Sequence, residues 1–259
     1  MIISAMKRDD LKEFLDEKVQ EFNRPEFIET DPIQVAKLFS EKENIEIAGF
    51  LTATISWGNR AAIIKNALRL MEMLDHQPHD FIMNASPFEL QNLQKFVHRT
   101  FNGHDLIHFV ESLKNIYQNH GGLESVFETG FQKSATVYGA LEHFFNVFFE
   151  NGGERTRKHV SSVSKGASAK RLNMYLRWMC RNNKSGVDFG LWKGIPPSAL
   201  MLPLDVHTGN VGRKLGLLQR KSNDWKAVEE ITANLRCFDP DDPIKYDFAL
   251  FGLGVFEKF

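Results

Sequence analysis

Two short stretches, GASAKRLN at residues 166–173 and LPLDVHT at residues 202–208, carry the most information in this chain. Each precedes apolar residues at helical spacing, so each is expected to open a helix. The first stretch supplies the amine of Lys170, and the second supplies the carboxylate of Asp205. These two side chains are therefore expected at the starts of two helices, in the most basic part of the chain.

The pattern outside these stretches is also helical. No alternating apolar and polar run is long enough to predict a strand, so the expected fold class is all-α. Asp31 is expected to cap a helix that begins at Pro32. Ser56 or Asn59 is expected to cap a later one. The remaining predicted helices are an early one ended by Pro25, a buried central one over 45–55, and those over 105–117, 136–149, 169–181, 206–215, 224–235 and 243–253.

Composition restricts the class of protein. The 259 residues are 42% hydrophobic and 25% charged, as in an ordinary globular protein. No apolar run approaches the roughly 20 residues that span a bilayer, and residues 1–10 are charged too early for a signal peptide. The two cysteines, Cys180 and Cys237, cannot hold an iron–sulfur cluster. We expect a cytoplasmic monomer that requires no cofactor and has no membrane partner.

The net charge of −1 does not favour nucleic-acid binding, but the charge is unevenly distributed. Between Glu154 and Ser185 nine basic residues face one acid. This pattern indicates either a solvated helix face or a surface for phosphates. Gly152-Gly153 and the segment up to residue 166 are the best linker candidate, and a Gly- and Pro-rich loop is expected over 182–200.

Each of the two key side chains has an ordinary alternative role. Lys170 lies beside the apolar stripe Ala169, Leu172, Leu176 and Met179, and desolvation and nearby cations such as Arg171 would lower its pKa and make it nucleophilic. It is otherwise a surface lysine. Asp205 can stabilise a developing cation, or it can simply be the N-cap of the helix that follows. His207, in the first turn of that helix, can donate to a phosphate.

The two stretches resemble the helix-hairpin-helix (HhH-GPD) DNA glycosylase superfamily. Gly166-Ala167-Ser168-Ala169-Lys170 is similar to its Gly-x-Gly-x-Lys hairpin, and Pro203-Leu204-Asp205-Val206-His207 to its Pro-x-Asp-x-His string. The chain is most like a bacterial offshoot of the 8-oxoguanine DNA glycosylase branch. Weaker similarity extends over most of the chain, to the wedge segment at 55–59, to Arg99 with residues 121–123, and to the base-recognition helix at 246–251.

The resemblance implies a two-lobed fold with an active-site cleft between the lobes. Lobe A would cover about 45–150, and lobe B would combine 1–44 with 151–259. The chain departs from the family pattern at three points. Ser168 replaces the second hairpin glycine, Lys170 and Asp205 are 35 positions apart, which is longer than usual, and Trp57 stands where a smaller polar residue is expected.

The implied activity is base excision repair. The protein would remove a damaged base, an oxidised purine above all, from double-stranded DNA, with or without AP lyase activity. Lys170 and Asp205 would be catalytic, and Asp247 and Phe251 would recognise the extruded base, unless they serve as core or capping residues. No catalytic metal is implied, although a monovalent cation can sit on the hairpin. The DNA-binding residues would be Gly166, Ala167, Ser168, Ala169, Arg171, His207, Trp57 and Asn59, with Trp57 as a wedge or as a core residue.

Three other functions remain open on the sequence alone. The hairpin can bind DNA or structured RNA without catalysis, which the modest charge and Ser168 favour. A metal-dependent hydrolase can use His104, Asp105 and His108, since the two histidines share a helix face; paired surface histidines explain the same pattern. A purely structural helical scaffold is the last alternative, but it leaves the Lys170 and Asp205 strings unexplained.

Overall fold

The structure is a computed structural model that describes residues 7–182 and 184–259. These residues are predominantly helical, which confirms the all-α fold class. Residues 1–6, on which the expected absence of a signal peptide partly rests, and residue 183 of the predicted 182–200 loop lie outside the described residues. Within the described part of the chain, no helix has both the length and the apolar character needed to cross a membrane.

The chain divides into two compact units. Unit 1 combines the described residues up to Phe27 with Ser162–Phe259, and unit 2 is Ile28–Ser161. The division between Ser161 and Ser162 lies inside the segment that the sequence indicates as a linker. The lobe boundaries implied by the resemblance stay a prediction.

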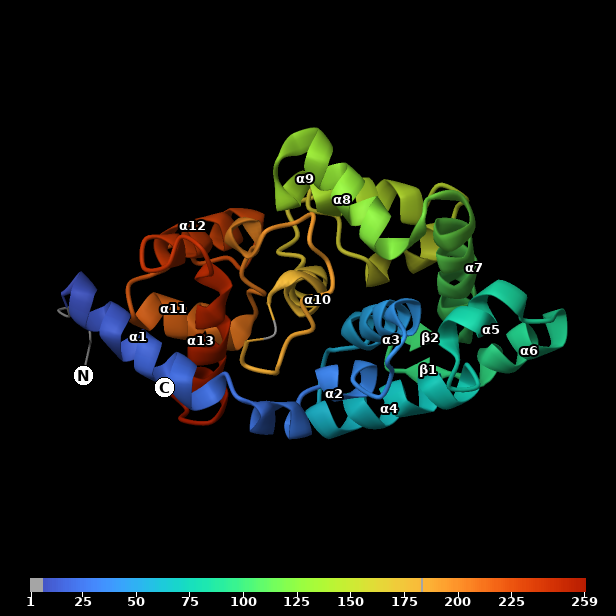
Figure 1. The fold of residues 1–259 in the computed structure, drawn as a ribbon, viewed down its shortest axis with the longest axis horizontal. Coiled ribbons are helices and arrows are strands. Elements are labelled where there is room, and N and C mark those ends of the chain that lie inside the picture. Colours follow the sequence, from blue (N-terminus) through green and yellow to red (C-terminus); the bar gives the residue numbers. More distant parts are fainter. Residues whose placement is uncertain (1–6, 183) are drawn as a thin grey trace. The chain divides into compact units, whose positions relative to one another are not determined.

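Unit 2 is a helical array with one very short hairpin (Figure 1). The strands β1 (Val97–His98) and β2 (Phe101–Asn102) pair antiparallel, with His98 opposite Phe101. Helices α8 and α9 pack against each other, and α3 packs against α2 and α5. The helices of this unit are α2 (Ile33–Ala36), α3 (Lys42–Thr54), α4 (Arg60–Met73), α5 (Pro78–Asn84), α6 (Pro87–Asn92), α7 (Gly103–Asn119), α8 (Gly122–Ser134) and α9 (Val137–Phe148), with 3-10 turns at Leu93–Lys95 and Glu154–His159.

The core of unit 2 is aromatic. Phe50 of α3 stacks on Phe109 of α7 at 5.7 Å between ring centroids and meets Phe144 of α9 edge to face at 5.3 Å. Phe127 of α8 stacks on Phe144 at 4.4 Å. Every residue of α3 from Asn44 to Thr54 is buried, so the predicted buried central helix is confirmed. The reason is that apolar residues occur on all sides of this helix.

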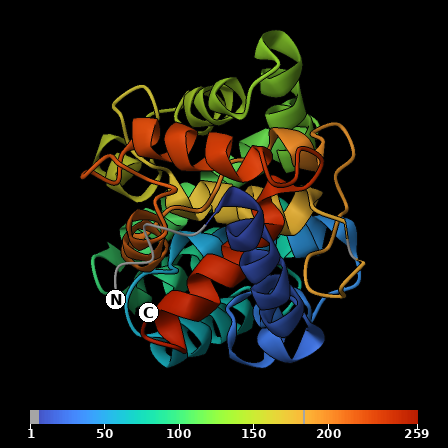
Figure 2. The ribbon, with the colours of Figure 1, turned by 90° about the vertical axis from the view of Figure 1, so that its left-hand side faces the viewer.

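Unit 1 contains α1 (Arg8–Phe22) and the C-terminal helices. Figures 1 and 2 show α1, in dark blue, running along α13, in red, and these two helices pack together. Helix α13 also packs against α11. The C-terminal helices are α10 (Lys170–Cys180), α11 (Val206–Lys214), α12 (Trp225–Arg236) and α13 (Tyr246–Val255), with 3-10 turns at Pro197–Ala199 and Pro243–Lys245. The 3-10 turn Pro25–Thr30 contains the first division between the units.

The predicted helices exist with ends shifted by a few residues, and some corrections follow. The helix expected at Pro32 begins at Ile33, and Asp31 Oδ1 accepts from the Ile33 backbone N–H at 3.0 Å. The element expected over 243–253 is a 3-10 turn followed by α13. Helices α5, α6 and α8 were not predicted. The first two are short, which leaves too few residues for a periodic pattern.

The largest correction concerns α10. The sequence indicates one buried stripe with a basic face opposite, but every residue from Leu172 to Cys180 is buried. Helix α10 is therefore a central helix of unit 1, although its buried part includes Arg177 and the buried Arg181 follows as its C-cap.

Candidate functional site

The hairpin that precedes Lys170 is tied to the start of α12. The Gly166 backbone N–H donates to the Val163 carbonyl at 2.8 Å, and the Gly166 carbonyl accepts from the Trp225 N–H at 3.0 Å. Gly166 has a φ of +82°, in the left-handed region that favours glycine. An added Cβ at this position would meet no heavy atom within 4 Å, so the backbone angle rather than crowding requires glycine.

Ser168 creates no backbone strain at the position where the glycosylase hairpin pattern has glycine. The left-handed residue is instead Ala169, at the N-cap of α10, with a φ of +49°. The carbonyl of Ser168 accepts from Asn173 Nδ2 at 3.1 Å, which ties the hairpin to the first turns of α10. The departure at Ser168 is therefore compatible with a well-formed hairpin.

Lys170 is the first residue of α10 and is half-buried. Its ammonium lies 3.7 Å from Met174 Sδ, a weak acceptor. Among the described residues no carboxylate lies within ion-pair distance of Lys170 Nζ. Lys170 therefore has no strong hydrogen-bond or ion-pair partner within the described residues, so its amine can bind a ligand or react.

Asp205 is the N-cap of α11, as the capping interpretation predicts. Its Oδ1 accepts from the Thr208 backbone N–H at 3.0 Å, and its own N–H donates to Thr208 Oγ1 at 2.9 Å. Asn223 Nδ2 donates to the Asp205 carbonyl at 2.9 Å, which holds the backbone in place. Capping uses Oδ1, and within the described residues Oδ2 accepts no hydrogen bond, so one oxygen of the half-buried carboxylate is left for another cation.

A buried ion-pair network runs from α10 to α13, and sequence reasoning missed it. Arg177 donates to Asp188 at 3.2 Å through Nε and to Asp247 through Nη1. Arg181 donates to Asp188 at 3.0 Å and, through Nε, to both oxygens of Asp242 at 3.0 Å. Two of the nine basic residues between Glu154 and Ser185 are therefore buried in ion pairs. These two belong neither to a solvated helix face nor to a surface for phosphates.

A signal for this network was present in the spacing. Arg177 lies seven positions after Lys170 and Arg181 lies eleven after it, and both separations return to the same face of a helix. The guanidinium of Arg177 also lies over the ring of Phe248, at 4.4 Å from its centroid. Charged residues that share a face with buried apolar residues are expected to pair with acids from distant parts of the chain.

The carboxyl of Asp247 connects this network to Lys170 and Asp205. Burial raises the pKa of Asp247, the charge of Arg177 lowers it, the carboxylate of Asp205 raises it and the ammonium of Lys170 lowers it, with a net pKa of about 6. Asp247 forms an ion pair with Arg177 of α10, the helix that begins at Lys170. Lys170, Asp205 and Asp247, three of the residues predicted for the site, all belong to unit 1.

The other residues of unit 1 that were predicted to contact DNA or the extruded base differ in how exposed they are. His207 is exposed in the first turn of α11, and Arg171 is half-buried, where desolvation lowers its pKa to about 10. Phe251 is half-buried, and its ring meets Phe27 and Phe256 edge to face at 6.1 and 6.2 Å. Phe251 thus takes part in packing, and its contact with a base stays a prediction.

Trp57 and Asn59 belong to unit 2. Asn59 is the N-cap of α4 and accepts from the Ala62 N–H at 3.1 Å, which confirms one of the two expected caps. Trp57 is half-buried, with His98 at 5.0 Å edge to face and His159 stacked at 6.0 Å. Trp57 is thus supported by two histidine rings, and its predicted role as a wedge stays untested by this arrangement.

The alternative metal site is not formed. Among the described residues there is no group of three His, Cys, Asp or Glu side chains that could hold a metal ion. Asp105 is fully buried, where it accepts from the Asn102 N–H at 3.0 Å as part of a capping box. His108 stacks on Phe149 at 5.7 Å between centroids, and burial lowers its pKa. These residues support the start and the packing of α7.

One buried oxygen atom beside the hairpin, Asn173 Oδ1, is suited to bind a monovalent cation. Asn173 is 1% exposed, and within the described residues its Oδ1 has no hydrogen-bond partner. Because Asn173 Nδ2 donates to the Ser168 carbonyl, this oxygen lies beside the hairpin. Together with hairpin carbonyls it would hold such an ion, which would stabilise the turn.

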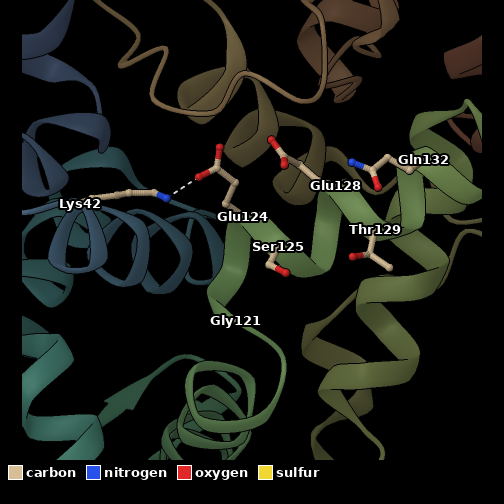
Figure 3. A pocket seen from close by; sticks show the side chains of 7 residues that line it. All are labelled: Lys42, Gly121, Glu124, Ser125, Glu128, Thr129 and Gln132. Carbon is tan, nitrogen blue, oxygen red and sulfur yellow. Dashed lines mark ion pairs between the residues drawn. The ribbon is translucent and has the colours of Figure 1, made fainter.

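Unit 2 contains an open pocket of about 310 Å³ along α8. Figure 3 shows that Lys42 of α3 points its ammonium at Glu124, with which it forms an ion pair, while the other side chains come from α8. No residue predicted for the catalytic or DNA-binding site lines this pocket. Its lining residues are Lys42, Gly121, Glu124, Ser125, Glu128, Thr129 and Gln132.

Comparison with other proteins places the chain in a family. No curated protein and no solved structure matches it. Residues 31–256, most of the chain, match the family described as "Protein of unknown function (DUF2400)", and the chain therefore belongs to that family.

Proposed function

We propose that this protein is a DNA N-glycosylase that removes a damaged base through Lys170. The observation that carries the proposal is that Lys170 and Asp205 both lie at helix starts of unit 1, where, among the described residues, Lys170 Nζ has no carboxylate within ion-pair distance and Asp205 Oδ2 accepts no hydrogen bond. Lys170 is half-buried and has only Met174 Sδ as a hydrogen-bond partner within the described residues. An amine without an ion-pair partner, with a carboxylate at the start of another helix of the same unit, suits attack on an electrophilic carbon.

The reaction consists of two bond changes at the sugar. The neutral amine of Lys170 forms a bond to C1′ while the bond from C1′ to the base breaks, and the bonding electron pair leaves with the base. Asp205, whose Oδ1 caps the helix that follows, stabilises through its carboxylate the positive charge that develops on the sugar. Loss of a proton and ring opening convert the adduct to a Schiff base, which permits strand cleavage by β-elimination.

The same proposal includes the mode of DNA binding. The 166–169 hairpin and the exposed His207 would bind phosphates, and the hairpin donors would be the Ser168 and Ala169 N–H groups, because those of Gly166 and Ala167 donate to the Val163 and Ser162 carbonyls. Trp57 would support the opened duplex, because an aromatic face stabilises an unstacked base by roughly 1–3 kcal/mol. The substrate would be duplex DNA with an oxidised purine, and the fold would be the two-lobed glycosylase type. The enzyme would act as a cytoplasmic monomer, with a monovalent cation held beside Asn173.

Covalent trapping tests the enzyme directly. Borohydride reduction with duplexes that contain 8-oxoguanine or an abasic site is expected to trap an adduct with the wild-type protein. Lys170→Gln should abolish it, whereas Lys165→Gln, which changes an exposed lysine of the same segment, should retain it. Absence of any wild-type adduct across oxidised, alkylated, uracil and abasic substrates would contradict the proposal. If the protein still bound duplex DNA, a non-catalytic binding protein would be the better conclusion.

Asp205 has a test of its own. Asp205→Asn keeps an N-cap residue, so the fold and DNA affinity should persist while base release slows by roughly 100-fold or more. Asp224→Asn is the matched control, since Asp224 caps α12 through the Ala227 N–H. Equal rates for the two variants would show that Asp205 is only a cap.

A further inference from the structure

Residues 223–225 contact the hairpin of unit 1, and we call them the bridging segment. The Trp225 N–H donates to the Gly166 carbonyl at 3.0 Å, and Asp224 pairs with Ala167 in an isolated antiparallel bridge. Trp225 is buried and is the first residue of α12. The bridging segment is therefore held against the hairpin by backbone bonds, which do not depend on its side chains.

The same segment also contacts the backbone of Asp205. Asn223 Nδ2 donates to the Asp205 carbonyl at 2.9 Å. Three consecutive residues span at most about 7 Å between their outer Cα atoms, so one short stretch of chain binds both the hairpin before Lys170 and the cap residue of α11. Lys170 and Asp205 are 35 positions apart in the sequence, and the bridging segment gives the two strings a common support.

Arg213 fixes the side chain of Asn223. Its Nη2 donates to Asn223 Oδ1 at 2.6 Å, and the same guanidinium donates to the carbonyls of Arg220 and Lys221, each at 2.8 Å. A guanidinium only donates and a carbonyl only accepts, so one orientation of the Asn223 amide satisfies both of its partners. Gly209 of α11 leaves room for this arrangement, since a Cβ added there would lie 2.8 Å from Asn223 Oδ1. The amide donor of Asn223 therefore has a fixed direction.

The cap of α11 is complete without Asn223. Asp205 Oδ1 accepts from the Thr208 N–H at 3.0 Å, and the Asp205 carbonyl accepts the first helical bond of α11 from the Gly209 N–H at 2.9 Å. Asn223 adds a donor to this carbonyl from outside α11. What the added bond provides is a connection between Asp205 and the segment that holds the hairpin.

We propose that Asn223, held by Arg213, is a positioning residue that sets the place of the Asp205 carboxylate relative to the hairpin before Lys170. The inference rests on the proposed function, in which Lys170 and Asp205 act on one sugar. Asn223 acts only through the backbone of Asp205, since its amide is already used by Arg213 and by that carbonyl. A displacement of about 1 Å can slow catalysis roughly 100-fold, so a bond that fixes this backbone affects the rate.

The rate of base release tests this role, with Asn234→Ala as the matched control for Asn223→Ala. Asn234 Nδ2 also donates to a backbone carbonyl of unit 1, that of Leu217, at 2.9 Å. In a single-turnover assay on duplex DNA that contains 8-oxoguanine, Asn223→Ala should slow base release roughly 10–100-fold and keep DNA affinity within about twofold of wild type. Asn234→Ala should leave both unchanged. Equal rates of base release for the two variants would overturn the inference.

A second variant serves if Asn223→Ala does not fold. Asn223→Asp keeps an acceptor for Arg213 but has no donor for the Asp205 carbonyl. Its added negative charge would favour a cation on the sugar, so slower base release in this variant reports the lost bond. Base release at the wild-type rate in Asn223→Asp would overturn the inference.

A double-mutant cycle shows whether Asn223 acts through Asp205. When Asp205→Asn is already present, Asn223→Ala should change the rate of base release by less than about twofold, because the carboxylate that it positions is gone. A role in the general stability of unit 1 would instead slow both backgrounds by the same factor. Equal factors in the two backgrounds would overturn the inference.

A measurement without substrate separates this inference from the proposed function. In Asn223→Ala, the Thr208 amide should keep its protection from hydrogen exchange, while the carboxyl-carbon NMR signal of Asp205, assigned from Asp205→Asn, should move. Asn234→Ala should change neither. An Asp205 signal that does not move, or loss of the Thr208 protection, would overturn the inference. Absence of an adduct with the wild-type protein would instead refute the proposed function.

Discussion

Each unit contains a helix with a long run of consecutive buried residues, α3 in unit 2 and α10 in unit 1. Helix α3 is buried from Asn44 to Thr54 and places Phe50 among the rings of α7 and α9. Helix α10 is buried from Leu172 to Cys180 but includes Arg177, whose charge is met by two aspartates. Apolar contacts predominate around the first helix, although its buried Glu46 accepts from Tyr117 Oη at 2.7 Å, whereas ion pairs to two aspartates help to hold the second.

The two kinds of core differ in the side-chain substitutions that they tolerate. Apolar packing accepts a change of side chain when the volume is nearly conserved. A buried ion pair accepts almost no change of one partner alone, because the other charge stays behind without compensation. The candidate chemistry lies in the unit with the less tolerant core. A buried network of charges can set the pKa of a carboxyl such as that of Asp247, whereas aromatic rings carry no charge that could do so.

The largest effect is expected from Arg177→Met. It leaves the buried carboxylates of Asp188 and Asp247 with fewer donors and should lower the free energy of unfolding by about 3–5 kcal/mol. Arg155→Met, which removes an exposed arginine, should change it by less than about 0.5 kcal/mol. Urea denaturation measures both. Similar values for the two variants would show that the network does not stabilise unit 1.

Acid should act on the two units in opposite directions. The folded pKa of Asp247, about 6, lies above its ordinary value, so lowering the pH from 7 to 5 should stabilise unit 1 by about 1.4 kcal/mol through this group. Burial lowers the pKa values of His98, His108 and His143 in unit 2, so the unfolded state binds more protons below about pH 6.5. Unit 2 should therefore lose stability over the same range.

Hydrogen exchange followed by mass spectrometry separates the two effects. Peptides from α13 should exchange more slowly at pH 5 than at pH 7, after correction for the intrinsic rate, and peptides from α7 and α9 should exchange faster. In Asp247→Asn the slowing in α13 should disappear while the change in unit 2 remains. Parallel changes in both units would contradict the expected difference.

Phe50→Leu should have a moderate effect. The leucine retains most of the buried apolar surface but loses ring contacts to Phe109, Phe144 and Phe148, so the expected cost is about 1 kcal/mol. Thermal denaturation followed by circular dichroism measures it. A loss as large as that of Arg177→Met would show that the aromatic core is as intolerant as the charge network.

The smallest effect is expected at two left-handed alanines, one in each unit. Ala169 precedes α10 with a φ of +49°, and Ala135 follows α8 with a φ of +55°. Glycine relieves this strain at each position, offset by the entropy of the more flexible unfolded chain, so each change should stabilise the protein by about 0.5 kcal/mol. Chemical denaturation of Ala169→Gly and Ala135→Gly tests this. A destabilised Ala169→Gly alone would show that the hairpin needs the alanine methyl group.

The amino-acid sequence by itself determined the helical class, the burial of α3, and the caps at Asn59 and Asp205. These features depend on neighbours within one or two helical turns, so spacing and residue type are sufficient to predict them. The hairpin before Lys170 was likewise visible as a short glycine-containing string.

Only the tertiary structure decided which charged residues are buried and with what they pair. Arg177 meets Asp188 eleven positions away and Asp247 seventy positions away. A basic run of nine residues looks the same in sequence whether its members face water or carboxylates from other helices. The choice depends on how α10 and α13 pack, since burial of a charge is favourable only where a partner from a distant part of the chain is already in position.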